Sequence, residues 1–184
     1  MARTESTMLA LGTTVPDFTL PDVVNGKTVA LSALKSSKAL LIFFICPHCP
    51  FVVHVEKELS ALGNEYTAQG VAVVAICSND VVQFPQDGPE GMREQATRLG
   101  FRFPYLHDDS QAVAHAFKAA CTPDIFLFDG TQKLVYRGQL DGSRPGNDVP
   151  VTGTDLRTAL DAVLAGKPVA EDQRASLGCN IKWK

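Results

Sequence analysis

The chain has 184 residues, long enough for one sizeable hydrophobic core, and we predict a single domain over residues 1–184 with a tail from about residue 170. Its net charge is −3 and it has no basic block, which argues against nucleic acid as a partner. No apolar run approaches the ~18 residues of a membrane span, and the first residues lack a secretory pattern. We therefore expect a cytoplasmic protein that does not contact a membrane.

The first half of the chain alternates between strand and helix patterns. Residues 38–45 are apolar and rich in strand-forming side chains, so we predict a buried strand there. From Phe51 to about Gln69 the apolar residues recur at helical spacing, and residues 71–76 form a second apolar strand. A strand, a helix and a strand within about 40 residues predict a βαβ unit with parallel strands.

The second half predicts further helices and a hairpin. Helices are expected at about residues 90–99, at 111–118 after an Asp109-Ser110 N-cap, and from an N-cap at Thr154, with a short extended segment at 103–106. Residues 124–128 and 133–137 are apolar strands separated by a turn, which predicts an antiparallel pair. The whole pattern indicates an α/β fold with a mixed sheet.

The five cysteines stand at positions 46, 49, 77, 121 and 179. An odd number in a reducing compartment argues against a static disulfide framework. The stretch Cys46-Pro47-His48-Cys49 falls between the predicted strand and the predicted helix of the βαβ unit. Two cysteines at this spacing and in this context indicate a redox pair.

The predicted chemistry of this pair depends on where the helix begins. We place the start at about Pro47, which puts Cys46 near the N-cap. The helix dipole and a protonated His48 then both favour a thiolate on Cys46, the expected nucleophile. Cys49, on the first turn, is the expected resolving thiol that attacks a mixed disulfide on Cys46. Pro50 would fall at about the fourth helical position, where its missing N–H has no explanation.

Several stretches together resemble one family. They are Val15–Pro21, the Cys46-Pro47-His48-Cys49 pair, and Thr122-Pro123 just before a predicted strand. With further similarity along nearly the whole chain, they resemble the AhpC/TSA-like, peroxiredoxin-related group of the thioredoxin superfamily. The resemblance implies a thioredoxin-like fold with a central mixed sheet flanked by helices and an N-terminal β-hairpin over about residues 17–31.

The resemblance also implies an activity and a site. The activity is that of a thiol–disulfide oxidoreductase with antioxidant function, acting on a protein or small-molecule disulfide or thiol without a cofactor or a metal. The implied site comprises Cys46, Cys49, His48, Pro47, Thr122 and a cis Pro123. The Pro-His dipeptide is that of periplasmic disulfide oxidases and implies an oxidising pair, whereas the expected cytoplasmic location favours a reductant.

Two departures from related patterns leave alternatives open. Leu40 stands where thioredoxins bury an acid, so the proton acceptor for Cys49 is not identified. Phe43 stands where a peroxiredoxin has threonine, which weakens the alternative of a thiol peroxidase acting through Cys46. A further alternative is a metal-binding module using Cys46, Cys49 and perhaps Cys121 or His48, although no second CxxC completes a zinc site.

The three remaining cysteines have less distinctive surroundings in the sequence. Cys77 ends an apolar strand and Cys121 precedes Pro123, and for both we favour an inert buried thiol. Cys179 lies in the C-terminal tail. There it could be a packed anchor or a mobile resolving thiol, and the sequence does not separate these two roles.

Overall fold

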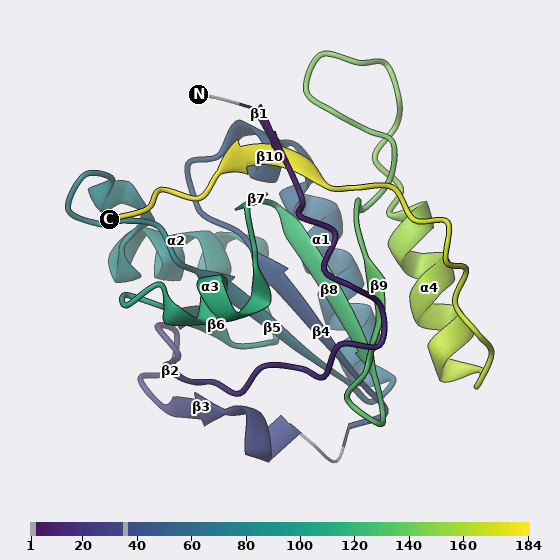
Figure 1. Cartoon of the computed structure of the whole chain (residues 1–184). Coiled ribbons are helices and arrows are strands. Elements are labelled where there is room, and N and C mark those ends of the chain that lie inside the picture. The colour runs from purple at the N-terminus through teal and green to yellow at the C-terminus, as the bar shows by residue number, and fades with distance from the viewer. Residues whose placement is uncertain (1–2, 35–36) are drawn as a thin grey trace.

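A five-stranded mixed sheet forms the centre of the computed structural model, which describes residues 3–34 and 37–184 (Figure 1). Its strand order is β6-β5-β4-β8-β9. The bounds are β4 Ala39–Phe44, β5 Val71–Cys77, β6 Tyr105–His107, β8 Asp124–Asp129 and β9 Leu134–Arg137. Strands β4, β5 and β6 run parallel, while β8 is antiparallel to β4 and β9 to β8. The predicted βαβ unit, the hairpin and the mixed sheet are therefore confirmed.

Side chains alternate between two cores on the opposite faces of this sheet. On β4, Leu41 and Phe43 join one apolar cluster, and Leu40 and Ile42 join the other. The first cluster is completed by α1 Pro50–Ala68, α2 Pro89–Leu99 and α4 Thr154–Leu164. The second is completed by α3 Ala112–Phe117 and by the N-terminal segment (Figure 1). All six residues of β4 are buried, because it is central and covered on both faces.

The segments outside the central sheet form two smaller sheets. Strands β2 Thr19–Pro21 and β3 Thr28–Ala30 pair as an antiparallel hairpin, which confirms the N-terminal extension, and a 3-10 turn, η1 Leu31–Leu34, follows. The second sheet has the order β1-β10-β7 and was not predicted. It joins β1 Arg3–Glu5 and β10 Leu177–Asn180 to the short strand β7 Cys121–Thr122. The tail is thus fixed beside the residue that precedes Pro123 (Figure 1).

Two predicted helix caps are wrong by one or more residues. Helix α4 begins at Thr154, and its N-cap is Gly153, whose φ of 67° is in the left-handed region. Helix α3 begins at Ala112 after Gln111, not after Asp109-Ser110. Its first amide groups instead donate to the side chains of Ser110 and Asp108, at 3.2 and 2.9 Å. Polar side chains upstream therefore satisfy this helix start without occupying the N-cap position.

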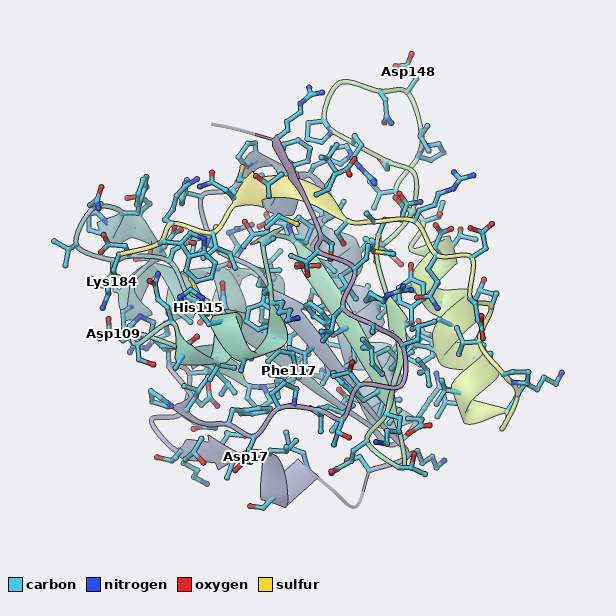
Figure 2. The ribbon with its side chains drawn as sticks, in the orientation of Figure 1. Asp17, Asp109, His115, Phe117, Asp148 and Lys184 are labelled. Atoms are coloured by element: carbon cyan, nitrogen blue, oxygen red, sulfur yellow. The ribbon has the colours of Figure 1, made fainter. Side chains whose placement is uncertain are left out.

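Figure 2 shows how the tail and α3 are held. Phe117, the last residue of α3, is fully buried, and at the surface Lys184 pairs with Asp109 at 3.0 Å. Over the described ranges, 3–34 and 37–184, no helix is long and apolar enough to cross a bilayer.

Candidate active site

Helix α1 begins three residues later than predicted, at Pro50, and Cys49 is its N-cap. The correction has a steric cause. A residue that precedes proline is disfavoured in the helical region, so Cys49 takes an extended conformation with φ −67° and ψ 120°. Pro50 occupies the first helical position, where a missing N–H costs nothing. Pro50 is thus explained, and Pro47 lies in the loop that connects β4 to α1 rather than in the helix.

The two thiols of the CxxC stretch lie together against the loop that contains Pro123. Both cysteines are buried. Cys46 Sγ is 3.6 Å from Thr122 Oγ1, and Cys49 Sγ is 3.1 Å from the carbonyl oxygen of Thr122. The Thr122–Pro123 peptide bond is cis, as expected. The structure therefore brings Cys46, Cys49, Thr122 and Pro123 into one site.

Negative charge is favoured on Cys49, which reverses the expected order. The pKa of Cys49 is lowered to about 5, chiefly because Cys46 donates a hydrogen bond to its sulfur; Cys179, Thr122 and the Val52 N–H add to this, against the opposing effect of burial. The pKa of Cys46 is raised well above its usual value by its hydrogen bond to Cys49 and by burial, with a smaller contribution from the charge of Asp87. The later helix start adds to this, because Cys49 as N-cap faces the free Val52 N–H of the first turn.

His48 is held by a buried carboxylate that the sequence did not reveal. Its Nδ1 lies 2.5 Å from Oδ2 of Asp87, and its backbone N–H donates to Oδ1 at 3.2 Å. Asp87 is fully buried and also accepts a hydrogen bond from Asn79 at 2.8 Å. The His48 ring stacks on Phe84, with centroids 5.5 Å apart. His48 is therefore fixed in place, and its charge when protonated is offset by Asp87.

Asp87 reaches the site because of the sheet topology. It ends a 3-10 turn, η2 Pro85–Asp87, in the polar loop that follows β5. The parallel strands β4 and β5 end at the same edge of the sheet, so the segments after Phe44 and Cys77 meet there. Because this loop follows the second strand of a βαβ unit, the sequence could have placed the loop near the site. Nothing in the sequence singled out Asp87 among the polar residues of the loop.

One group of side chains could hold a metal ion. Among the described residues, ligand atoms of Cys46, His48 and Asp87 all lie within 4.8 Å of one another. Cys46 Sγ and His48 Nδ1 are 4.0 Å apart, so both atoms could bind one ion. The group differs from the predicted metal set, because Asp87 takes the place given there to Cys49 and Cys121.

The other three cysteines are buried, but only one of them adjoins the pair. The thiols of Cys77 and Cys121 approach the carbonyl oxygens of Asp87 and Pro123, each at 3.5 Å, and burial raises the pKa of both. Cys179 lies on β10, and its thiol is hydrogen-bonded to that of Cys49. Of the two roles considered for Cys179, the packed anchor is the one observed.

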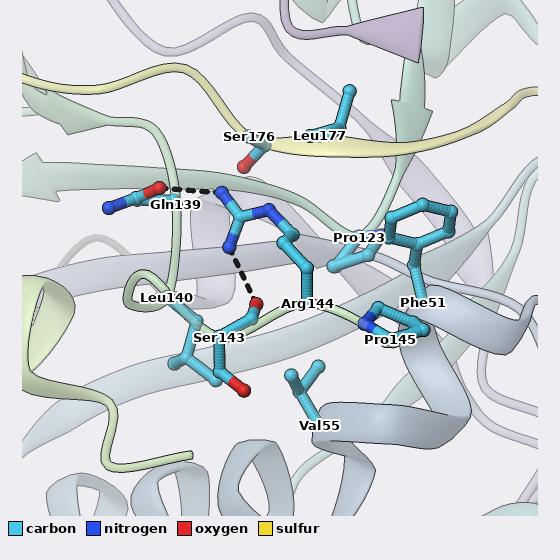
Figure 3. Close-up of a pocket in the computed structure, with 10 residues that line it drawn as sticks. All are labelled: Phe51, Val55, Pro123, Gln139, Leu140, Ser143, Arg144, Pro145, Ser176 and Leu177. Atoms are coloured by element: carbon cyan, nitrogen blue, oxygen red, sulfur yellow. Dashed lines mark hydrogen bonds between the residues drawn. The ribbon is translucent and has the colours of Figure 1, made fainter. Parts of the chain in front are cut away.

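A pocket opens beside Pro123 (Figure 3). Its walls include Phe51 at the start of α1, Leu140 and Arg144. The Arg144 guanidinium donates to Gln139 Oε1 at 2.5 Å and to the carbonyl oxygen of Ser143 at 2.7 Å. The loop between β9 and α4 therefore folds inward to line this recess.

Comparison with known proteins identifies the family. A family model described as Redoxin matches residues 10–156. The chain belongs to the Redoxin family. Thiol-disulfide oxidoreductase ResA from Geobacillus kaustophilus is 30% identical over 141 residues, which cover 74% of this chain and 75% of ResA. This Redoxin is accordingly a thioredoxin-like oxidoreductase of the AhpC/TSA-like group, as the resemblance implied.

Solved structures place the fold of this Redoxin. The crystal structure of an uncharacterized conserved protein from Geobacillus kaustophilus has a TM-score of 0.97 and 54% identity, covering 100% of this chain and 97% of that one. The thioredoxin domain of a thiol-disulfide oxidoreductase from Bacteroides vulgatus has a TM-score of 0.58 and 20% identity, covering 74% of this chain and 90% of that one. The expected thioredoxin-like fold is confirmed.

The low pKa of Cys49 predicts a pH dependence that can be measured. In the reduced protein we expect a thiolate with a midpoint near pH 5, seen as ultraviolet thiolate absorbance that is missing in Cys49→Ser. Because the folded pKa is depressed, the thiolate adds stability that is complete above the unfolded thiol pKa of about 8.5 and is lost as the pH falls through about 5. As the pH rises between these two values, the unfolding free energy of the reduced wild type should therefore increase relative to that of Cys49→Ser.

Cys121→Ser is the matched control for this titration, since Cys121 is buried nearby but is protonated over the whole range. It should leave the midpoint unchanged. A single midpoint at pH 8 or above in the wild type would show that the charge is not held on Cys49.

Proposed function

We propose that this Redoxin is a thiol–disulfide oxidoreductase that cycles Cys46 and Cys49 between dithiol and disulfide through a mixed disulfide on Cys46. The observation that carries the proposal is that both sulfurs of the CxxC stretch lie against the same residue of the Thr122–Pro123 loop, 3.6 Å from Thr122 Oγ1 for Cys46 and 3.1 Å from its carbonyl oxygen for Cys49. The relationship to ResA, which is named a thiol-disulfide oxidoreductase, supports it.

The surroundings of the two sulfurs assign their order of reaction. Cys49 is enclosed by Cys46, Thr122 and Cys179, all inside the protein. Cys46 adjoins His48, whose side chain is 17% exposed, so a substrate disulfide approaches Cys46 from the His48 side. We therefore place the reaction with the substrate at Cys46, the nucleophile that the sequence led us to expect.

The first step of the cycle uses the charge on Cys49. As Cys46 Sγ bonds to one sulfur of the substrate, the substrate S–S bond breaks and one substrate thiolate leaves. The proton of Cys46 passes to the Cys49 thiolate, its hydrogen-bond partner, which serves as the base. This arrangement supplies the proton acceptor that the sequence lacked at Leu40, although it acts on Cys46 rather than on Cys49.

The second step resolves the mixed disulfide. Cys49 gives its proton to the departed thiolate and attacks Cys46 Sγ; the bond from Cys46 to the substrate breaks, and the second substrate thiolate leaves. Two electrons pass from the Cys46–Cys49 pair to the substrate. A stabilised Cys49 thiolate favours the reduced form, so the Cys46–Cys49 disulfide is a stronger oxidant than an ordinary protein disulfide. The same steps in reverse would oxidise a substrate dithiol.

The proposal predicts opposite effects of serine at the two positions. Cys46→Ser should reduce the rate of insulin disulfide reduction with dithiothreitol to the uncatalysed background, because the attacking sulfur is gone. Cys49→Ser should accumulate a mixed disulfide on Cys46, seen by non-reducing electrophoresis and peptide mapping. Cys77→Ser, which removes a buried thiol without a role in the scheme, should keep wild-type turnover. Full turnover by Cys46→Ser would refute the proposal.

A thiol peroxidase acting through Cys46 is the second candidate. The Thr122 hydroxyl, 3.6 Å from Cys46 Sγ, favours it, because it replaces the hydroxyl missing at Phe43. The Cys49 thiol, burial and the charge of Asp87, however, all raise the pKa of Cys46 and so oppose a Cys46 thiolate. Stopped-flow oxidation by hydrogen peroxide separates the two candidates. A Cys46 oxidation rate no faster than that of free cysteine would exclude the peroxidase and retain the oxidoreductase.

A further inference from the structure

The backbone of β10 brings Cys179 to the thiol pair. Cys179 is the strand partner of Thr122, whose carbonyl oxygen lies 3.1 Å from Cys49 Sγ. The adjacent Gly178 packs so closely that a Cβ atom there would overlap this same carbonyl oxygen. The close approach of β10 to the Thr122–Pro123 loop thus depends on Gly178. This packing leaves Cys179 only 2% exposed.

Cys49 lies between two thiols. It is hydrogen-bonded to Cys46 on one side and to Cys179 on the other, and all three belong to the same apolar cluster. Cys121 is a useful contrast. It precedes Thr122 and pairs with Asn180, but its thiol approaches the carbonyl oxygen of Pro123 at 3.5 Å instead of bonding to Cys49.

We propose that Cys179 is a third redox thiol, which exchanges with the Cys46–Cys49 disulfide to form a Cys49–Cys179 disulfide. The inference rests on the proposed function, because the first disulfide supplies the oxidation state. It adds a residue to the cycle and a second oxidised form to the protein.

The exchange is balanced within the chain. Cys179 loses its proton and its sulfur attacks Cys49 Sγ; the Cys46–Cys49 bond breaks, and Cys46 leaves as a thiolate that takes up a proton. One disulfide replaces another, so the step needs no external oxidant or reductant. The two sulfurs must approach from hydrogen-bonding contact to the bonded distance of about 2.05 Å. Cys46 becomes a free thiol again while the protein stays oxidised.

The surroundings of Cys179 indicate that this exchange is slow compared with reaction at Cys46. Burial, followed by the hydrogen bond to Cys49, raises the pKa of Cys179 to about 12, so little of it is thiolate at neutral pH. The Cys46–Cys49 disulfide should therefore form first, and the Cys49–Cys179 disulfide should accumulate when no reductant removes the first.

The test uses the full-length Cys46→Ser variant, which keeps Cys49 and Cys179 and cannot form the first disulfide. After treatment with diamide, peptide mapping under non-reducing conditions should show a Cys49–Cys179 cross-link in the monomer. The double variant Cys46→Ser/Cys179→Ser should show no cross-link to Cys49. The matched control Cys46→Ser/Cys121→Ser should form the cross-link as fully as Cys46→Ser does.

The wild type supplies a second measurement that does not depend on Cys46→Ser folding correctly. After diamide treatment and incubation, iodoacetamide should label Cys46 in the molecules that carry the Cys49–Cys179 cross-link. A wild type that forms only Cys46–Cys49, with no labelled Cys46, overturns the exchange and leaves the proposed function standing. A wild type without a Cys46–Cys49 disulfide at early times overturns the proposed function itself. A Cys49–Cys121 cross-link in either protein also overturns the role of Cys179.

Discussion

Replacing Asp87 with asparagine is expected to lower the free energy of unfolding by about 1–3 kcal/mol, because it leaves a buried hydrogen-bond donor without its partner. The carboxylate is fully buried and accepts hydrogen bonds from Asn79 and from the His48 backbone, besides its contact with the His48 ring. An amide of the same shape cannot accept at both of its positions, so at least one buried donor would lose its partner.

The same substitution should make Cys46 more reactive. The charge of Asp87 raises the pKa of Cys46, and its removal also frees the His48 ring, 4.0 Å away, to interact with a Cys46 thiolate. A shift of one pKa unit corresponds to roughly a tenfold increase in thiolate at neutral pH. Alkylation of Cys46 by iodoacetamide, followed by mass spectrometry at fixed pH, measures this effect, and denaturant unfolding measures the loss of stability.

Asp80→Asn is the matched control for Asp87→Asn. Asp80 is buried in the same loop, but its carboxylate accepts from Val82 and Gln83 and does not contact His48. It can lose local stability without changing the alkylation rate of Cys46. Equal rates in Asp87→Asn and the wild type would show that Asp87 is only structural, whereas a faster rate identifies it as a positioning residue that acts on Cys46 directly and through His48.

Gly178→Ala is expected to separate β10 from the active site and to lower the free energy of unfolding by about 1–3 kcal/mol. The added methyl group would overlap the carbonyl oxygen of Thr122, which is backbone and cannot turn aside. Either β10 or the Thr122–Pro123 loop must shift. Both shifts weaken the contacts that Cys49 makes with Thr122 and Cys179.

Two measurements check the Gly178 prediction. Denaturant unfolding should show the lower stability, and Cys179, 2% exposed in the native protein, should become open to alkylation before global unfolding. Gly142→Ala is the matched control, because its added methyl group would meet only Val149 Cγ1 at an ordinary 3.8 Å. A Gly178→Ala protein as stable and as protected as Gly142→Ala would mean that β10 is not held as tightly as this packing implies.

Elements defined by local periodicity could be predicted from the sequence. The buried strand β4 and the helical stripe Val52, Val55, Leu59 and Leu62 follow from apolar spacing alone, and all four stripe residues are buried. The site was found for the same reason, because the CxxC stretch lies between two strong periodic patterns. The cis Pro123 came from resemblance, since spacing does not report the state of a peptide bond.

The start of α1 was misplaced although the sequence held the signal. Pro47 and Pro50 both suit a first helical position, and the earlier one was chosen. The rule that a residue before proline avoids the helical conformation excludes the earlier start, because Cys49 precedes Pro50 and would have been helical. The error moved the expected charge from Cys49 to Cys46, so one helix boundary altered the predicted electrostatics of the site.

Asp87 and Cys179 could not be predicted because both reach the site through tertiary packing. Asp87 is 39 residues from His48 in sequence, in a loop with several other polar residues. Strand β10 is four residues long, and its partners β1 and β7 are distant and shorter still. Strands of this length carry too little periodicity to be recognised, and their pairing is fixed by neighbours instead of by propensity.

The pairing of β1 with β10 has a mechanical consequence. Arg3 lies opposite Cys179 and Glu5 opposite Leu177, so residue 3 and residue 180 are at the same end of this antiparallel ladder. Tension that pulls these two ends apart therefore loads its hydrogen bonds one after another, as in unzipping, instead of shearing them all together. The first pair to yield is the one that holds Cys179, so a small stretching force would open the ladder beside the reactive thiols while the central sheet stayed intact.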